Sequence, residues 1–216
     1  MSLLSSIYKK RDSTKQAGFT LIELIVSIGI MLVIISTVAM SQSGYSSGAA
    51  LKNAANDISL SLRQAQVYGI SVREFSTGTA DFSAAFGIDF RLPGASGANN
   101  AYILFGDLGA HNGVYDSSWT CPVGGTSECI QKVSLAGDNT VSALCVVWLN
   151  DTEDCTLGRV DVTFLRPSTD AKLAIFNVSG QSVSSANAKG VKIKLVSPKS
   201  ETRSVTVYTT GQISVQ

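Results

Sequence analysis

Residues 18–40 read GFTLIELIVSIGIMLVIISTVAM and contain a single charged side chain, Glu23. The stretch from Phe19 to Met40 holds about 22 residues, nearly all apolar, and a helix rises about 1.5 Å per residue. Such a helix is about 33 Å long, which is enough to cross a hydrocarbon layer of about 30 Å. We therefore expect a membrane-spanning helix, and the carboxylate inside it indicates a functional role with a partner group.

A basic segment precedes this apolar stretch, with Lys9, Lys10, Arg11 and Lys15 set against a single acid. Positive charge is retained on the cytoplasmic side of a membrane, so the chain beyond the helix is expected to be exported. An ordinary secretory signal would place small residues for cleavage after its apolar region. Here Gly18 lies before the apolar region, which favours a different kind of processing.

The segment Gly18–Glu23 resembles the processing site of type IV pilins and type II secretion pseudopilins, and the resemblance covers roughly residues 15–45. It implies that a prepilin peptidase cuts between Gly18 and Phe19, that Phe19 is then N-methylated, and that the helix stays in the mature protein. It also implies that Glu23 pairs with the N-terminal amine of a neighbouring subunit, and that an inner-membrane platform assembles the subunits. Residues 1–18 would be a cytoplasmic leader that is removed. A plain single-pass anchor with an incidental glutamate is the alternative.

The composition argues against a general nucleic-acid binder. The whole chain carries a formal charge of +1, and without residues 1–18 it has 13 basic and 15 acidic side chains. A mature protein this close to neutrality lacks the strong basic excess of such binders.

The charges are unevenly spread along the chain. Eight acids lie in one region with only Lys132 and Arg159 among them: Asp107, Asp116, Glu128, Asp138, Asp151, Glu153, Asp154 and Asp161. Five bases lie in another region, with Glu201 as the one acid: Lys189, Lys192, Lys194, Lys199 and Arg203. Opposite charges on different parts of one subunit suit a head-to-tail contact between copies. A solvated surface that happens to be uneven is the alternative.

The apolar helix is expected to continue as an amphipathic helix over residues 41–73. A polar, glycine-bearing segment, residues 41–48, should be its least stable part. Apolar residues then recur at helical spacing, at Leu51, Ala54, Ala55, Ile58, Leu62 and Ala65. This stripe predicts a helix face that packs on a globular head, with close approach at the alanines.

Residues 74–216 change to short β-rich runs between turn residues, which predicts an antiparallel head domain. The expected strands are 85–91, 101–106, 130–135, 141–149, 159–166, 172–177, 191–196, 203–208 and 212–215. Turns at 167–170 and 197–200 predict two hairpins, whereas 95–100, 107–126 and 179–190 are expected to be surface loops. The predicted fold class is α+β: a long N-terminal helix, transmembrane over 19–40 and amphipathic over 41–73, packed on an antiparallel β head.

All four cysteines, Cys121, Cys129, Cys145 and Cys155, fall in the region expected to be exported. An even number of cysteines in an oxidising compartment predicts disulfides, with three connectivities open. Pairing of nearest neighbours is the default. Cys121 to Cys129 would close a short loop, whereas a regular hairpin turning at residues 151–153 would not place Cys145 opposite Cys155. A zinc site is the alternative, although His111 is the only histidine and no Cys-x-x-Cys pair is present.

No arrangement of residues in the sequence is typical of a catalytic site, so we expect neither an enzyme nor a cofactor. His111 lies in a sequence typical of a turn and lacks a recognisable nucleophile. The acidic turn with Asp151, Glu153 and Asp154 could coordinate calcium, but it lacks the ligand spacing of an EF-hand. An ordinary exposed turn is the alternative.

The basic residues Lys192, Lys194, Lys199 and Arg203 could contact phosphate groups. DNA uptake is a role of some FimT-like minor pilins, which resemble one another in a basic C-terminal tail. This chain instead ends in Ile213-Ser214-Val215-Gln216. A solvated edge that discourages aggregation is the alternative.

Together these features predict a structural subunit of a type IV pilus or type II secretion pseudopilus, anchored in the inner membrane before it enters a periplasmic or extracellular filament. The order of the late strands is similar to that of H-type minor pseudopilins and FimT-like minor pilins, which implies a minor subunit with two small antiparallel sheets. The absence of a helix proline near Met40 favours the same assignment. A DNA-binding minor pilin of a DNA-uptake system is the alternative function.

Overall fold

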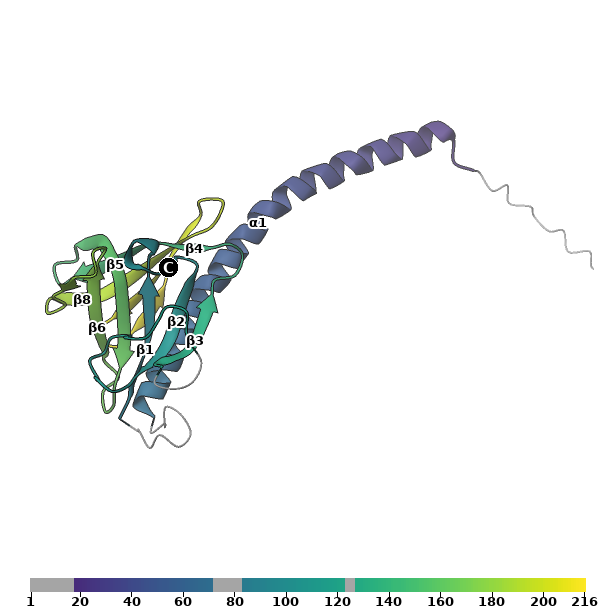
Figure 1. The fold of residues 1–216 in the computed structure, drawn as a ribbon. Helices are drawn as coiled ribbons and strands as arrows, with labels where there is room; N and C mark the ends of the chain where they lie inside the picture. The colour runs from purple at the N-terminus through teal and green to yellow at the C-terminus, as the bar shows by residue number, and fades with distance from the viewer. Residues whose placement is uncertain (1–17, 72–82, 123–126) are drawn as a thin grey trace, which may run out of the picture. The chain divides into compact units, whose positions relative to one another are not determined.

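The computed structural model describes residues 18–71, 83–122 and 127–216. The chain divides into two compact units, one ending at Ser43 and the other beginning at Gly44. Helix α1 (Leu21–Ile70) begins in the first unit and ends in the second (Figure 1). The fold is α+β, with a helix packed on an antiparallel β domain inside the second unit.

The amphipathic stripe of α1 is buried as its spacing predicts. Leu51, Ala54, Ala55, Ile58, Leu62 and Ala65 are each at most 1% exposed. All of them except Ala54 share one apolar core with sheet residues such as Ile88, Leu144, Val162, Ile193 and Val205. Burying a leucine or isoleucine side chain stabilises a fold by about 1.5–3 kcal/mol, so this face supplies much of the energy that holds the helix on the sheet. The helix ends at Ile70, three residues before the expected end.

The head contains a ten-stranded antiparallel sheet in the order β10-β9-β8-β4-β5-β1-β2-β3, with β6 paired to β5 and β7 to β6. Its strands are β1 (Ala85–Arg91), β2 (Ala101–Asp107), β3 (Cys129–Ser134), β4 (Thr140–Trp148), β5 (Glu153–Phe164), β6 (Ala171–Asn177), β7 (Ser182–Val183), β8 (Ala188–Val196), β9 (Thr202–Tyr208) and β10 (Ile213–Val215). A short 3-10 helix, η1 (Pro93–Ala95), follows β1. The two hairpins predicted from turns are confirmed, because β5 pairs with β6 and β8 with β9.

Strand β5 differs most from the expectation, since it begins at Glu153 rather than at residue 159. Its first part pairs with β4, and its second part pairs with β1 on one side and β6 on the other. The predicted pair of small sheets is therefore one sheet, joined through this 12-residue strand. Local sequence pattern missed residues 153–158 because they carry polar side chains and a glycine, which are weak strand formers on their own.

The β4–β5 hairpin turns earlier than expected, and this corrects the geometry of one cysteine pair. Asp151 lies in the turn with a φ of 61°, and its amide donates to the carbonyl of Trp148 at 3.0 Å. The register then pairs Val146 with Asp154, which places Cys145 opposite Cys155. Disulfides join Cys121 to Cys129 and Cys145 to Cys155 in the structure.

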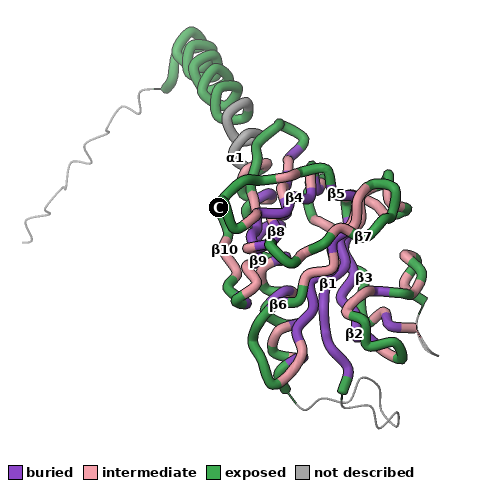
Figure 2. Tube along the Cα trace, turned by 90° about the vertical axis from the view of Figure 1, so that its left-hand side faces the viewer, coloured by how far each residue is buried: buried purple, intermediate pink, exposed green. Residues whose placement is uncertain are grey.

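Two predicted surface loops contain more structure than expected. The segment 179–190 includes β7 and the start of β8. The described part of 107–126 begins at the last residue of β2 and covers the outer face of the sheet, where Tyr115 is fully buried against Ile103 and Phe105. Figure 2 shows the consequence: β1 is buried along nearly its whole length, because the helix covers one face and this loop the other.

Candidate functional site

The segment at the start of α1 carries the residues that the sequence marks for processing and assembly. Gly18 and Phe19 lie before the first helical turn, and Phe19 is 83% exposed. The hydroxyl of Thr20 accepts a hydrogen bond from the Glu23 amide at 3.3 Å, so Thr20 caps the helix. Glu23 occupies the third helical position, where an acid favours the positive end of the helix dipole. The local sequence thus specifies a helix that begins at Leu21, directly after the Thr20 cap.

The helix beyond this cap exposes its apolar side chains on all sides. Leu21–Ala39 is 19 residues long, is apolar enough to cross a membrane and has none of its length buried in the protein. Leu21, Met31 and Val33 are 77%, 62% and 65% exposed. An apolar surface of this extent is stable only against lipid or against other apolar protein surfaces. The basic residues Lys9, Lys10, Arg11 and Lys15 lie outside the described residues.

The head contains a second notable group, a cluster of four charges on β1 and β5. Asp89 and Asp161 are register partners on these strands, as are Arg91 and Arg159. Both carboxylates are completely buried, whereas the arginine side chains are 12% and 16% exposed.

Ion pairs and hydrogen bonds tie the cluster together. Arg91 Nε contacts Asp89 at 2.7 Å, and Arg159 Nη2 contacts Asp161 at 2.6 Å. Arg159 Nε also lies 3.4 Å from Asp89, so one guanidinium bridges both carboxylates. Both arginines donate to the carbonyl of Tyr115, at 2.9 and 2.7 Å, which attaches the covering loop to the sheet.

Burial sets the protonation of this cluster. Desolvation raises the pKa of Asp89, opposed by the nearby arginines. Desolvation raises the pKa of Asp161 further, and the neighbouring Asp89 adds to that shift. Two adjacent buried carboxylates therefore favour holding a proton between them. Tyr115 is affected in the same way, since burial and the nearby Asp89 raise its pKa to about 12.

Sequence reasoning missed this cluster, although a signal for it exists. The expected strands contain Asp89-Phe90-Arg91 and Arg159-Val160-Asp161, in which the two charged residues share one face of the strand. Antiparallel pairing of the two strands places acid beside acid and base beside base, so that each charge also has an opposite charge nearby. Only the pairing of β1 with β5, which are far apart in sequence, reveals the match.

Three of the eight acids in the acidic region are buried in the head, while Asp116, Asp138, Asp151 and Glu153 are exposed. Asp107, Glu128 and Asp161 are at most 4% exposed. Asp107 accepts a hydrogen bond from the Gly113 amide at 2.6 Å, and Glu128 accepts one from the Asp116 amide at 2.6 Å. These two carboxylates hold the covering loop in place, and desolvation raises the pKa of each. His111 lies exposed in the same loop.

Two carboxylates of the acidic turn, those of Asp151 and Glu153, form ion pairs with lysines of β8. Lys189 Nζ lies 2.5 Å from Asp151, and Glu153 is bonded to both Lys192 and Lys194. Asp154 accepts hydrogen bonds from the amide and the hydroxyl of Thr156, at 3.0 and 2.8 Å. Ammonium groups thus contact the carboxylates of Asp151 and Glu153, and that of Asp154 is bonded within its own strand.

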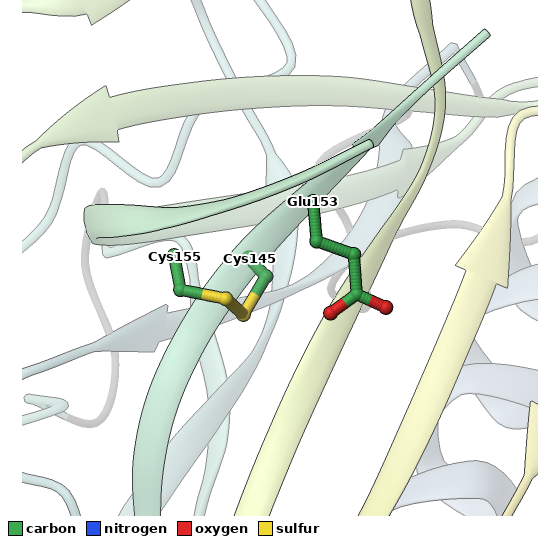
Figure 3. Close-up of side chains that lie close together, drawn as sticks. All are labelled: Cys145, Glu153 and Cys155. Atoms are coloured by element: carbon green, nitrogen blue, oxygen red, sulfur yellow. A yellow bond between two sulfur atoms is a disulfide. The ribbon is translucent and has the colours of Figure 1, made fainter. Parts of the chain in front are cut away.

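Cys145, Glu153 and Cys155 lie close together at this hairpin, as Figure 3 shows. The two cysteines form a disulfide, which leaves no thiolate to bind a metal ion. Glu153 alone is not a metal site.

The expected basic patch is partly neutralised, because two of its lysines form ion pairs with Glu153. Lys192 and Lys194 lie on the outer face of β8 beside Glu153, while Arg203 on β9 is exposed. Lys199 lies in the turn between these strands. The bonds to Glu153 reduce the positive potential that a nucleic-acid phosphate would meet.

The comparisons with known proteins concern the N-terminal segment. Residues 13–39 match the family model described as the prokaryotic N-terminal methylation motif. No curated protein and no solved structure matches the chain. The matched residues include Gly18, Phe19 and Glu23, and they overlap the exposed apolar helix. The chain therefore carries a prepilin-type methylation motif, which supports assignment to the type IV pilin and pseudopilin family.

Proposed function

We propose that the protein is a pilin-like structural subunit that is cleaved after Gly18, methylated at Phe19 and assembled into a filament through α1. The observation that carries this proposal is the methylation motif on an apolar helical segment, Leu21–Ala39, none of which is buried in the protein. A bilayer covers that surface in the precursor, and neighbouring helices would cover it in a filament, where apolar burial supplies the energy of assembly.

In this proposal, Glu23 fixes how far each helix is shifted along its neighbour in the filament. An isolated carboxylate in an apolar environment is costly, so it is stabilised by a cationic partner. The methylated amine of Phe19 on a neighbouring subunit is such a partner. The helix cap at Thr20 holds Glu23 in the first turn, close to the cleavage site.

The test is replacement of Glu23 in the full-length chain expressed in its own host. Glu23→Ala should be inserted and trimmed to begin at Phe19, as intact mass would show, but its amount in sheared filaments should fall at least tenfold. Ser27→Ala removes another polar group one helical turn away and should assemble normally. Gly18→Ala should remain an untrimmed, unassembled precursor. Normal assembly of Glu23→Ala would contradict the proposal that this carboxylate pairs with a neighbouring subunit.

We further propose a minor rather than an abundant subunit, in a pilus or a secretion pseudopilus of the inner membrane. Support comes from the proline-free helix and from the order of the late strands, which resembles H-type minor pseudopilins and FimT-like minor pilins. Counting this chain against other pilin-like subunits in sheared filaments by mass spectrometry distinguishes the two roles.

The alternative of a DNA-binding subunit has less support. Its central lysines, Lys192 and Lys194, are held by Glu153, and the acids of the neighbouring turn face the same hairpin. A structural role requires no such patch, because the head would serve as the exposed part of the filament.

A further inference from the structure

The two arginines of the buried charge cluster also form the floor of a hollow on the outside of the head. This hollow has a volume of about 260 Å³ and lies between the end of β1 with η1 and the turn that follows β6. Arg91, Arg159 and Phe176 line it from the strands, and Ser96, Ser179 and Gly180 line it from the two loops. Small side chains in both loops leave this space open above the guanidinium groups.

The hydrogen bonds of both arginines go to Asp89, Asp161 and the Tyr115 carbonyl, and each guanidinium has N–H groups that these bonds do not use. Arg91 uses Nε and Nη2 for Asp89 and the Tyr115 carbonyl. Arg159 uses Nε and Nη2 for Asp161 and the same carbonyl. Within the described residues, neither Nη1 group donates a hydrogen bond. A guanidinium has five N–H donors, so each arginine can still bind an acceptor from the outer side.

Charge in the hollow favours an anion. None of the described residues that line it is acidic. Among the described residues, the carboxylates in contact with the arginines are those of Asp89 and Asp161, which are fully buried. Two guanidinium groups therefore line the hollow with no acidic side chain among its described lining residues.

The surroundings hold the arginines in a fixed geometry. The guanidinium carbon of Arg159 lies 4.9 Å from the centre of the Phe176 ring, and that of Arg91 lies 5.3 Å from the Tyr115 ring. Stacking on an aromatic ring orients a guanidinium without using its N–H donors. The hydroxyls of Ser96 and Ser179 add two more donors at the rim, and neither has a hydrogen-bond partner among the described residues.

We propose that this hollow binds a compact oxyanion, a carboxylate or phosphate group, between Arg91 and Arg159. The planar fork of arginine matches the geometry of both groups and binds them through paired hydrogen bonds. The hollow is large enough for one such group with part of the molecule that bears it. The inference concerns the head alone and holds whether or not the chain assembles through α1.

The experiment is a titration of the full chain in uncharged detergent micelles. Inorganic phosphate and acetate are added separately, each against sodium chloride at matched ionic strength, and the Nε–Hε signals of Arg91 and Arg159 are followed by NMR. The expected result is a saturable shift of both signals with at least one oxyanion and no saturation with chloride. Saturation by phosphate alone identifies a phosphoryl ligand, and saturation by acetate identifies a carboxylate ligand.

Two variants locate the site without disturbing the ion pairs. Ser179→Phe places a large side chain in the hollow and should weaken binding at least tenfold. Ser184→Phe makes the same change at an exposed position outside the hollow and should bind like the unaltered protein. Absence of saturation with both oxyanions in the unaltered protein, or unchanged affinity in Ser179→Phe, would overturn the proposal.

Discussion

The segment Leu21–Ala39 and the head place their side chains in opposite ways. In the segment, apolar side chains are exposed along the whole length of the helix. In the head, Asp89, Asp107 and Asp161 are buried while apolar residues fill the core around them. The buried carboxylates of the head are each bonded to a group of the head itself: Asp89 to Arg91, Asp107 to the Gly113 amide and Asp161 to Arg159. In the segment, by contrast, no part of the helix is buried within the part of the chain that the structure describes, so its apolar surface needs lipid or another apolar protein surface to cover it.

The largest effect should come from breaking the buried cluster. Asp161→Ala leaves Arg159 without its closest carboxylate, and removal of one partner from a buried ion pair costs about 3–5 kcal/mol of stability. Urea unfolding in uncharged detergent, followed by fluorescence of Trp119 and Trp148, measures the change. Asp151→Asn removes an exposed ion pair, suits the left-handed backbone at this position and serves as the matched control, with a loss far smaller than that of Asp161→Ala. Equal losses in both variants would mean that burial of these charges has no energetic consequence.

A second test compares Gly69, where α1 packs on the head, with Gly29 in the segment Leu21–Ala39. An added Cβ at Gly69 would lie 2.3 Å from the carbonyl oxygen of Phe164, so helix and strand must separate to accept it. We expect Gly69→Ala to destabilise the head by about 1–3 kcal/mol in the same urea experiment. Gly29→Ala meets no atom within 4 Å, and its effect on head stability should stay within about 0.5 kcal/mol. A neutral Gly69→Ala would show that the end of α1 is loosely held.

The pH dependence of the head provides a third test. Burial raises the pKa of Asp89 above its ordinary value of 3.8, so the folded state binds a proton more tightly than the unfolded state does. This contribution to stability is complete below pH 3.8 and is lost as pH rises through the higher folded pKa.

Asp89→Asn removes one titrating group while keeping the shape of the side chain. Its unfolding free energy should fall less steeply with rising pH than that of the unaltered protein, by at most about 1.4 kcal/mol per pH unit for one proton. A residual slope is expected, because Asp107 and Glu128 also have raised pKa values. Unchanged pH profiles, measured by urea unfolding from pH 4 to pH 8, would contradict a shared proton at this site.

The smallest effect is expected at the exposed charges of the β4–β5 hairpin. Glu153 is about one third exposed (32% of its side chain), so solvent screens its bonds to Lys192 and Lys194. Glu153→Gln should lower the unfolding free energy by about 0.2–1 kcal/mol, and added salt should reduce the difference. A loss as large as that of Asp161→Ala would contradict the expectation that buried charges contribute more to stability than exposed ones.

Much of the fold could be predicted from local pattern. The helix cap at Thr20, the apolar stripe from Leu51 to Ala65 and the hairpin turns at 167–170 and 197–200 depend on residues close together in sequence. Strand β7 was missed because two residues carry too little periodicity to be recognised. The polar residues of the covering loop predict a solvated surface loop, but Asp107 and Glu128 bind its amides and hold it on the sheet.

The amino-acid sequence determines the methylation motif and the apolar helix of the N-terminal segment, because a run of apolar residues with one acid and a helix cap depends only on residues close together in the chain. Tertiary structure decides the character of the head. Whether Asp161 is a solvated surface acid or half of a buried pair depends on which strand lies beside β5 and which loop lies above it. Those neighbours come from far along the chain, and the environment that sets the charge of a side chain exists only once they have come together.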